Sequence, residues 1–332
     1  MESSLIAVKI LQVASLYSTA VGCLTFTAGV IGNAVNILVF LRVAQFRHHR
    51  SIFYLIIESI SDFLYQFFSI TITIFISLYG NDLTNRVLIW CRLKYVFAQS
   101  FGLITFSMIC FQAVDQFFST NYRCVLRQIF TYTLAQYTAF GTVCLWLLHS
   151  LACSFYVSII PSIGCIISNS IWIHYVTYVF YPVLVGFLPI TIASVFSLLA
   201  YRNVRRIVRR QVPIERRRFD QQITAMILLR VICFIIFTLP YITFRIYIVN
   251  VPVEQTDLIH YALLQLVQVI IVSIVNLNYA ANFYIFFVSS ARYRRQVKYV
   301  LTKKCWRRWL IWNTKIVHPE NLTNYLPNVE ME

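Results

Sequence analysis

The stretch that decides the fold is LYSTAVGCLTFTAGVIGNAVNILVFL, residues 16–41, which contains no Asp, Glu, Lys or Arg. A helix that crosses about 30 Å of hydrocarbon needs roughly 20 mostly apolar residues, so this stretch is long enough for one crossing. Residues 128–201 also lack these four residue types, which leaves room for two crossings and a loop between them. The pattern predicts a protein whose helices span a membrane.

The other long apolar runs extend this pattern over most of the chain. Only 12% of the residues are charged and the mean hydropathy is +0.70, whereas soluble domains carry roughly 25% charged residues. We therefore predict an all-α membrane protein, a seven-transmembrane helix bundle that forms one domain over residues 16–288. The predicted spans lie near residues 16–41, 52–79, 92–117, 132–156, 174–201, 222–249 and 259–288.

The basic residues predict the orientation of these spans. With an extracellular N-terminus, 22 of the 28 Lys and Arg fall in segments that would face the cytoplasm. Cytoplasmic segments of membrane proteins carry the excess of Lys and Arg, so we expect a plasma-membrane protein with residues 1–15 outside and residues 289–332 in the cytoplasm. The net charge of +16 then reflects topology, and nucleic acid is excluded as a partner.

The segment SSARYRRQVKYVL, which follows the seventh span, predicts a short cytoplasmic helix. Tyr293, Val297, Val300 and Leu301 recur at helical spacing with basic residues between them. Such an amphipathic helix lies on the inner leaflet with its basic face toward anionic lipid. Cys305 follows it, and the sequence leaves open whether this thiol is palmitoylated or free.

Several landmark residues occur in a particular order along the spans: Gly32, Asn33, Asp62, Cys91, Asp115, Trp146, Pro189 and Pro240. Each is common in a membrane helix, but together their order and spacing resemble the rhodopsin-like G-protein-coupled receptors, from about Gly22 to Trp309. The resemblance implies a disulfide between Cys91 and Cys165, which both fall on the predicted outer side, where conditions are oxidising. This bridge would hold the second outer loop across the entrance for a ligand.

The resemblance also implies a polar cluster around Asp62 in the second span. A carboxylate in a membrane helix must face protein groups or water, which makes it a candidate functional residue. The family places Asn33, Thr105, Asn278 and Asn282 near it, and a sodium ion often binds in receptors that have this cluster. The same groups can instead hydrogen-bond one another and hold the helices together, and the sequence leaves both interpretations open.

Pro189 and Pro240 each remove one backbone hydrogen bond from a predicted span. In the family, the proline of the sixth span is the pivot about which the cytoplasmic half of that helix swings outward. A static kink is the alternative, because neighbouring groups can satisfy the freed carbonyl.

Three signature motifs of the family are altered, and they include the residues that would face a G protein. The third span ends in Asp115-Gln116-Phe117 where the family has Asp-Arg-Tyr, so the arginine that contacts the G protein is missing. Thr238 stands where a tryptophan usually precedes the proline, and the seventh span lacks its usual proline and has Phe286 in place of a tyrosine. The fold tolerates these changes, whereas coupling is no longer implied by the motifs.

The outer half of the spans restricts the ligand only in part. Residue 98 is Ala where amine receptors have an aspartate, and no Lys occurs between Lys94 and Lys298, so no Schiff base to retinal can form. Arg245 lies near the outer end of the sixth span, where it could bind a carboxylate or a peptide. The alternative is that its side chain extends to the membrane interface. The other polar candidates for the pocket are Gln99, Tyr241, Gln265 and Gln268.

Two charges that the family pattern does not require lie at matching depths. At about 1.5 Å per residue, Glu58 lies roughly 9 Å from the start of the second span and Arg230 roughly 12 Å from the start of the sixth. An unpaired charge at this depth costs at least a few kcal/mol, so we expect an ion pair, with Asp62 as the alternative partner of Arg230. The other interpretations are a protonated Glu58 and an arginine that extends to the headgroups.

The sequence therefore favours a receptor that passes the signal of an extracellular ligand, a peptide or a polar small molecule, to a heterotrimeric G protein. A receptor of the same fold that no longer couples is the first alternative, and a seven-helix transporter is the second. A transporter would be expected to show inverted repeats or broken helices, and the sequence shows neither. Without a metal cluster or a nucleophile paired with a base, we expect no enzyme, and sodium is the only cofactor considered.

The orientation can be tested with epitope tags on intact cells. A tag at the N-terminus should bind antibody without permeabilisation, whereas a tag within residues 206–216 should bind only after it, because that loop is rich in arginine. Reversed accessibility would overturn the orientation and the receptor interpretation with it.

Overall fold

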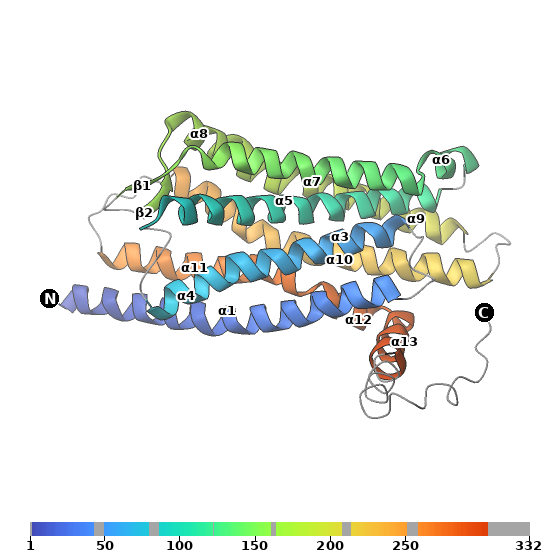
Figure 1. The fold of residues 1–332 in the computed structure, drawn as a ribbon, viewed down its shortest axis with the longest axis horizontal. Helices are drawn as coiled ribbons and strands as arrows, with labels where there is room; N and C mark the ends of the chain where they lie inside the picture. The colour runs from blue at the N-terminus through green and yellow to red at the C-terminus, as the bar shows by residue number, and fades with distance from the viewer. Residues whose placement is uncertain are drawn as a thin grey trace, which may run out of the picture.

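The computed structural model describes residues 2–42, 50–79, 86–121, 123–160, 164–207, 214–250 and 258–304. Within these residues the chain forms a bundle of long helices with one short β-hairpin (Figure 1). Seven helical segments are long and apolar enough to cross a membrane, which confirms the predicted helical bundle. They cover Ser4–Arg42, Arg50–Ile76, Leu88–Ser119, Tyr132–Ser154, Ser170–Arg206, Gln221–Ile248 and Leu258–Ala280.

The elements follow one another as a series of helices interrupted once by two strands. The first half of the chain forms α1 (Glu2–Arg42), α3 (Arg50–Tyr65), η1 (Gln66–Ile70), α4 (Thr71–Tyr79), α5 (Leu88–Ser119), α6 (Cys124–Ile129) and α7 (Tyr132–Ser154). The second half forms β1 (Val157–Ile160), β2 (Gly164–Ile167), α8 (Ser170–Tyr175), η3 (Val176–Phe187), α9 (Leu188–Ile207), α10 (Ile214–Asn250), α11 (Leu258–Ala280), α12 (Asn282–Ser289), α13 (Ala291–Tyr299) and η4 (Val300–Lys304).

Successive long helices run in opposite directions, so the bundle has two distinct ends (Figure 1). One end carries β1, β2 and α8, and we call it the hairpin end. The other end carries α6, α13 and the last turn of α1, and we call it the basic end because these segments, with the N-cap residue of α6, contain Arg42, Arg123, Arg127 and Arg294. Basic residues that are far apart in the sequence therefore gather at one end of the fold.

Helix α1 begins at Glu2, well before the predicted start of the first span at residue 16. Its 41 residues extend about 60 Å, roughly twice the thickness of a hydrocarbon core. Residues 2–15, which were expected to be only an N-terminal segment, continue the helix because they contain neither Gly nor Pro. The helix packs along α11, and Ala7 and Ala14 in the extension are buried.

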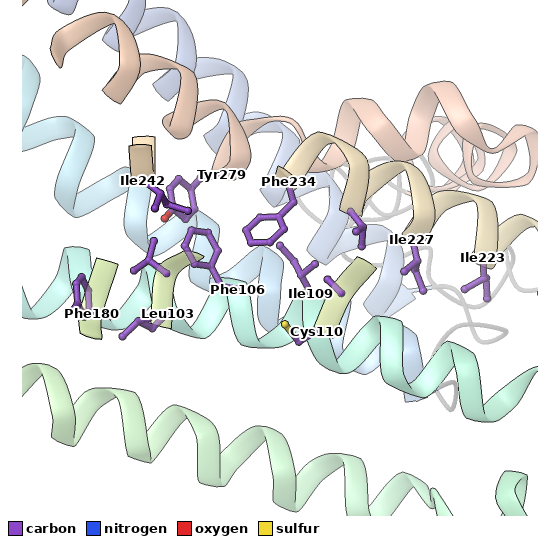
Figure 2. Packing of buried hydrophobic residues seen from close by; sticks show 13 residues of the cluster. Leu103, Phe106, Ile109, Cys110, Phe180, Ile223, Ile227, Phe234, Ile242 and Tyr279 are labelled. Carbon is purple, nitrogen blue, oxygen red and sulfur yellow. The ribbon is translucent and has the colours of Figure 1, made fainter. Parts of the chain in front are cut away.

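A hydrophobic cluster between α5, α9, α10 and α11 forms the main core (Figure 2). Phe106 of α5 and Phe234 of α10 pack together with their ring centroids 5.0 Å apart. Leu103 and Ile109 lie three residues to either side of Phe106 and belong to the same cluster. Lipid tails are as apolar as these side chains, so van der Waals packing rather than burial from water holds such helices together. Because α5 is enclosed by its neighbours, its polar side chains are enclosed as well.

The prolines affect their helices in different ways. Helix α9 contains Pro189 and α10 continues through Pro240 as an α-helix. The segment before α9 is instead a wide π-helix, η3, that contains Pro182, a residue the sequence analysis did not single out. Such widened segments are frequently found at functional sites. The role of Pro240 as a pivot stays a prediction.

The seventh span is interrupted at Ala281, where α11 ends and α12 begins. Two carbonyls just before the break bind side chains of other helices. Arg230 Nη2 donates to Asn278 O at 3.0 Å, and Asn33 Nδ2 donates to Tyr279 O at 2.8 Å. In an uninterrupted helix each carbonyl would accept from the N–H four residues later. We attribute the break to this competition, which replaces the single continuous span predicted for this segment.

Helix α13 lies across the basic end (Figure 1) and begins where the Ser290 hydroxyl accepts from the Tyr293 N–H at 3.2 Å. The Tyr293 hydroxyl donates to Asn36 Oδ1 of α1, and burial raises the pKa of this hydroxyl. Leu301, predicted on the apolar face, is 46% exposed because the helix widens into η4 there. The lipidation candidate Cys305 lies outside the described residues.

Cys91 and Cys165 form a disulfide at the hairpin end, with their Cα atoms 5.8 Å apart. The bond joins the first turn of α5 to β2, in which Cys165 is paired with Ile159 of β1. The hairpin is therefore fixed to the central helix of the bundle.

Removing this bond should destabilise the fold at the hairpin end. Cys91→Ala and Cys165→Ala should each cost about 2–5 kcal/mol and lower surface staining in flow cytometry. The double variant should be no worse than either single variant, because all three lose the same bond. Cys144→Ala is the control, since Cys144 is a free cysteine. Additive losses would show that the two cysteines do not act as one bridge.

Candidate functional site

The bundle contains an ion pair that is completely enclosed by protein. Glu58 of α3 and Arg230 of α10 both have 0% of their side-chain surface exposed, and Arg230 Nε lies 2.9 Å from Glu58 Oε1. These are the two residues whose depths matched in the sequence. Arg230 therefore pairs with Glu58 rather than with Asp62, and it does not extend to the basic end of the bundle.

Three more polar side chains complete this charged layer. Gln112 Nε2 of α5 donates to Glu58 Oε2 at 2.5 Å, and Arg230 Nη1 donates to Asn278 Oδ1 at 3.3 Å. Asn278 Nδ2 in turn donates to Thr238 Oγ1 at 2.8 Å. The layer thus connects α3, α5, α10 and α11. Thr238, which stands where the family has a bulky tryptophan, serves as the acceptor at the end of this chain.

The energetics of the layer favour a conformational role. An intact buried ion pair contributes little net stability, because the desolvation of both charges offsets their attraction. Removing one partner is costly, since it leaves the other charge buried without compensation. The pair Glu58–Arg230 therefore penalises any arrangement that separates α3 from α10.

Asp62 lies one turn from Glu58 on α3 and forms a second polar layer. Thr105 Oγ1 donates to Asp62 Oδ1 at 2.7 Å, and Asn282 Nδ2 donates to Asp62 Oδ2 at 3.4 Å. The other two expected partners have different contacts: Asn33 binds the carbonyl of residue 279, and Asn278 belongs to the charged layer. Asn33 instead bonds a backbone carbonyl of α11, and Asn278 bonds Arg230 of α10. The sequence does not give the position of either partner.

The sodium ion that the resemblance implies near Asp62 stays a prediction. Asn33 Oδ1 and Asn282 Oδ1 are buried without a hydrogen-bond partner, and the Asp62 carboxylate forms no ion pair with the described basic residues. Carboxylate, amide and hydroxyl oxygens are the ligands that hard cations prefer. Thr105 and Asn282 also link α3 to α5 and α12 directly, so the cluster holds helices together whether or not a cation is bound.

A third polar group lies toward the basic end, where the resemblance placed the G-protein-facing switch. Asp115 Oδ1 lies 3.3 Å from Arg50 Nε, and Asp115 Oδ2 accepts from the Ser51 hydroxyl at 2.5 Å. Gln116 is buried and its Nε2 donates to Thr224 Oγ1 of α10 at 2.6 Å. Gln116 therefore links α5 directly to α10, whereas the charged layer links them through Glu58 of α3.

The two aromatic members of the predicted switch lie elsewhere. Phe117 contacts Phe196 of α9 with ring centroids 5.5 Å apart. Phe286 is fully buried against Phe40 and Tyr293, in the cluster that holds α12 and α13 on α1. The four residues thus do not form one site.

Several polar partners in these layers were not predicted from the sequence: Arg50, Ser51, Gln112 and Thr224. One pattern could have found Gln112, because it precedes Gln116 by four residues and shares its helix face. No pattern within α10 singles out Thr224, since one threonine in a membrane helix is ordinary. Thr224 matters because its hydroxyl accepts a hydrogen bond from the buried Gln116 amide of α5.

The candidate ligand residues are half-buried in the hairpin half of the bundle. Tyr241 and Arg245 come together on α10, with the guanidinium carbon 5.3 Å from the Tyr241 ring centroid. Gln99 donates from Nε2 to the sulfur of Cys153 at 3.7 Å. Gln265 and Gln268 are half-buried on α11.

The charged layer can be tested by measuring stability. Arg230→Met should lower the free energy of unfolding by about 3–5 kcal/mol, because Glu58 is left buried and unpaired. The double variant Glu58→Leu/Arg230→Met should recover most of this loss. The measurement is thermal unfolding of the purified protein in micelles, with Arg202→Met, at an exposed position on α9, as the control. A double variant that shows the sum of two losses would mean that the residues do not stabilise each other.

Compared with models of known protein families and with curated protein sequences, the chain matches none of them. The geometry of the three polar groups and the arrangement of the helices are therefore the features that indicate a function.

Proposed function

We propose that the chain is a cell-surface receptor of the rhodopsin-like type, which passes the signal of an extracellular ligand to a heterotrimeric G protein by outward movement of α10. Seven helical segments able to cross a membrane, the disulfide from α5 to the hairpin and the basic residues at the opposite end support this proposal. The hairpin end then faces outward and the basic end faces the cytoplasm of a plasma-membrane protein.

The observation that carries the proposal is the buried ion pair between α3 and α10. Outward movement of α10 would have to break the contact between Glu58 and Arg230, and also the hydrogen bond between Gln116 and Thr224. Both contacts oppose the movement by which such receptors signal. They form a lock that keeps the unliganded receptor inactive without the arginine that the family uses.

A receptor that binds its ligand without coupling is the second candidate. Gln116 favours it, because this side chain is only 2% exposed and is already bonded to α10. A neutral amide also lacks the charge and the several donors with which an arginine engages a partner.

The lock can be tested by nucleotide exchange on a panel of G proteins with the receptor in nanodiscs. Glu58→Gln and Arg230→Leu should each raise basal exchange by about fivefold or more, as expected if the pair contributes at least 1 kcal/mol to the inactive state. The charge swap Glu58→Arg/Arg230→Glu should restore much of the low basal rate. Unchanged single variants in well-folded protein would reject the lock.

Coupling itself can be tested with one substitution at the basic end. Gln116→Arg should raise basal or agonist-driven exchange, because it restores a guanidinium where the family has one. The control is Gln116→Leu, which removes the same hydrogen bond to Thr224 without adding a charge. No exchange from the wild type or from Gln116→Arg, both at normal surface level, would favour the receptor that does not couple.

A further inference from the structure

Arg245 of α10 lies among tyrosines in the hairpin half of the bundle. Its guanidinium carbon is 5.4 Å from the ring centroid of Tyr181 in η3 and 5.3 Å from that of Tyr241 in α10. Tyr95 of α5 lies within electrostatic range of the same group. Residues from three helices therefore converge on one cation.

Arg245 differs from the fully buried Arg230 in its lack of a carboxylate partner among the described residues. Arg230 pairs with Glu58 and also bonds Asn278, whereas Arg245 forms no ion pair with any carboxylate that the structure describes. Its Nε is buried and has no hydrogen-bond partner. A guanidinium is a planar group of five donors that suits a carboxylate, so this donor set is incompletely used.

The surroundings do not fit an arginine that extends to the membrane interface. A side chain of that kind keeps its charged group in water, whereas the Arg245 guanidinium lies against two aromatic rings and its side chain is half-buried. The aromatic faces attract the cation, but they offer no anion to it.

The tyrosines also determine what kind of group fits beside the cation. Tyr95, Tyr181 and Tyr241 are each half-buried, so all three remain partly accessible. Their rings provide apolar faces and their hydroxyls provide hydrogen-bond donors. A molecule with a carboxylate next to an aromatic or other apolar group matches both features.

We propose that Arg245, with Tyr181 and Tyr241, recognises the carboxylate of the extracellular ligand, which therefore carries a free acid beside an apolar group. This inference rests on the proposed receptor function and specifies its ligand class. The carboxylate binds the guanidinium through two parallel hydrogen bonds, and the rings enclose the adjoining apolar part.

The proposal is tested with two probes that differ only in charge, 3-phenylpropionate and its neutral amide, 3-phenylpropanamide. In nanodiscs of neutral lipid, the acid at ten times its dissociation constant should raise the melting temperature of the full chain by about 2 °C, and the amide should not. Arg245→Gln should abolish the effect of the acid. Arg92→Gln should leave it unchanged, since Arg92 is also at the hairpin end but lies over Phe155 instead.

Three results with the wild type and Arg245→Gln would each overturn the proposal. The first is that the acid has no effect on the wild type at any soluble concentration, and the second is that its effect survives Arg245→Gln. The third is that Arg245→Gln alone lowers the melting temperature, as expected of a structural arginine. Glu254 and Asp257 lie outside the described residues and are the alternative internal partners. If they pair with Arg245, Glu254→Gln/Asp257→Asn will lower the melting temperature, which also rejects the proposal. The melting-temperature experiment contains no G protein, so a negative result for ligand binding is distinct from a negative result for coupling.

Discussion

A carboxylate and a guanidinium can both be fully buried in this bundle only because each replaces the water that the other has lost. Glu58 accepts from Arg230 and Gln112, and the remaining donors of Arg230 reach the side chain and the carbonyl of Asn278. These contacts are short and directional, so they fix α3, α5, α10 and α11 relative to one another. Apolar packing such as that in Figure 2 is non-directional, so it specifies the helix positions less tightly than the hydrogen bonds of the charged layer do.

The need to satisfy every buried donor of Arg230 also changes the shape of a neighbouring helix. Arg230 has more donors than Glu58 can satisfy, and one of them takes the carbonyl of Asn278. Helix α11 then ends at Ala280, and α12 begins separately with Asn282, whose side chain reaches Asp62. The arginine of α10 is thus linked through a break in the backbone to the polar cluster around Asp62.

The sequence predicted those features that depend on position along a helix. Runs of apolar residues gave the spans, and the depths of Glu58 and Arg230 matched because each lies a similar number of residues from the start of its span. Features that depend on the rotation of one helix against another were missed, such as the contact between Gln116 and Thr224. Asn33 and Asn278 were assigned to Asp62 by resemblance, but the local geometry directs them to a carbonyl and to Arg230.

The start of α1 and the break at Ala281 were missed for different reasons. Residues 2–15 contain two charged residues, Glu2 and Lys9, so they did not register as part of an apolar run, yet nothing in them ends a helix. At Ala281 the local sequence contains no proline or glycine, and the interruption comes from side chains more than forty residues away in the chain. Local propensity is informative only where distant groups do not compete for the backbone.

The two inner layers cannot change independently, because Glu58 and Asp62 lie one turn apart on α3 and Arg230, which pairs with Glu58, also acts electrostatically on Asp62. Movement of α10 that withdrew Arg230 would leave two enclosed carboxylates about 6 Å apart along the helix. Like charges at that spacing repel, and neither would have water to reduce the repulsion. Such a state requires a proton, a cation or entry of water at Asp62. Under the proposed movement of α10, the position of that helix and the binding of a proton or cation at Asp62 would each alter the free energy of the other.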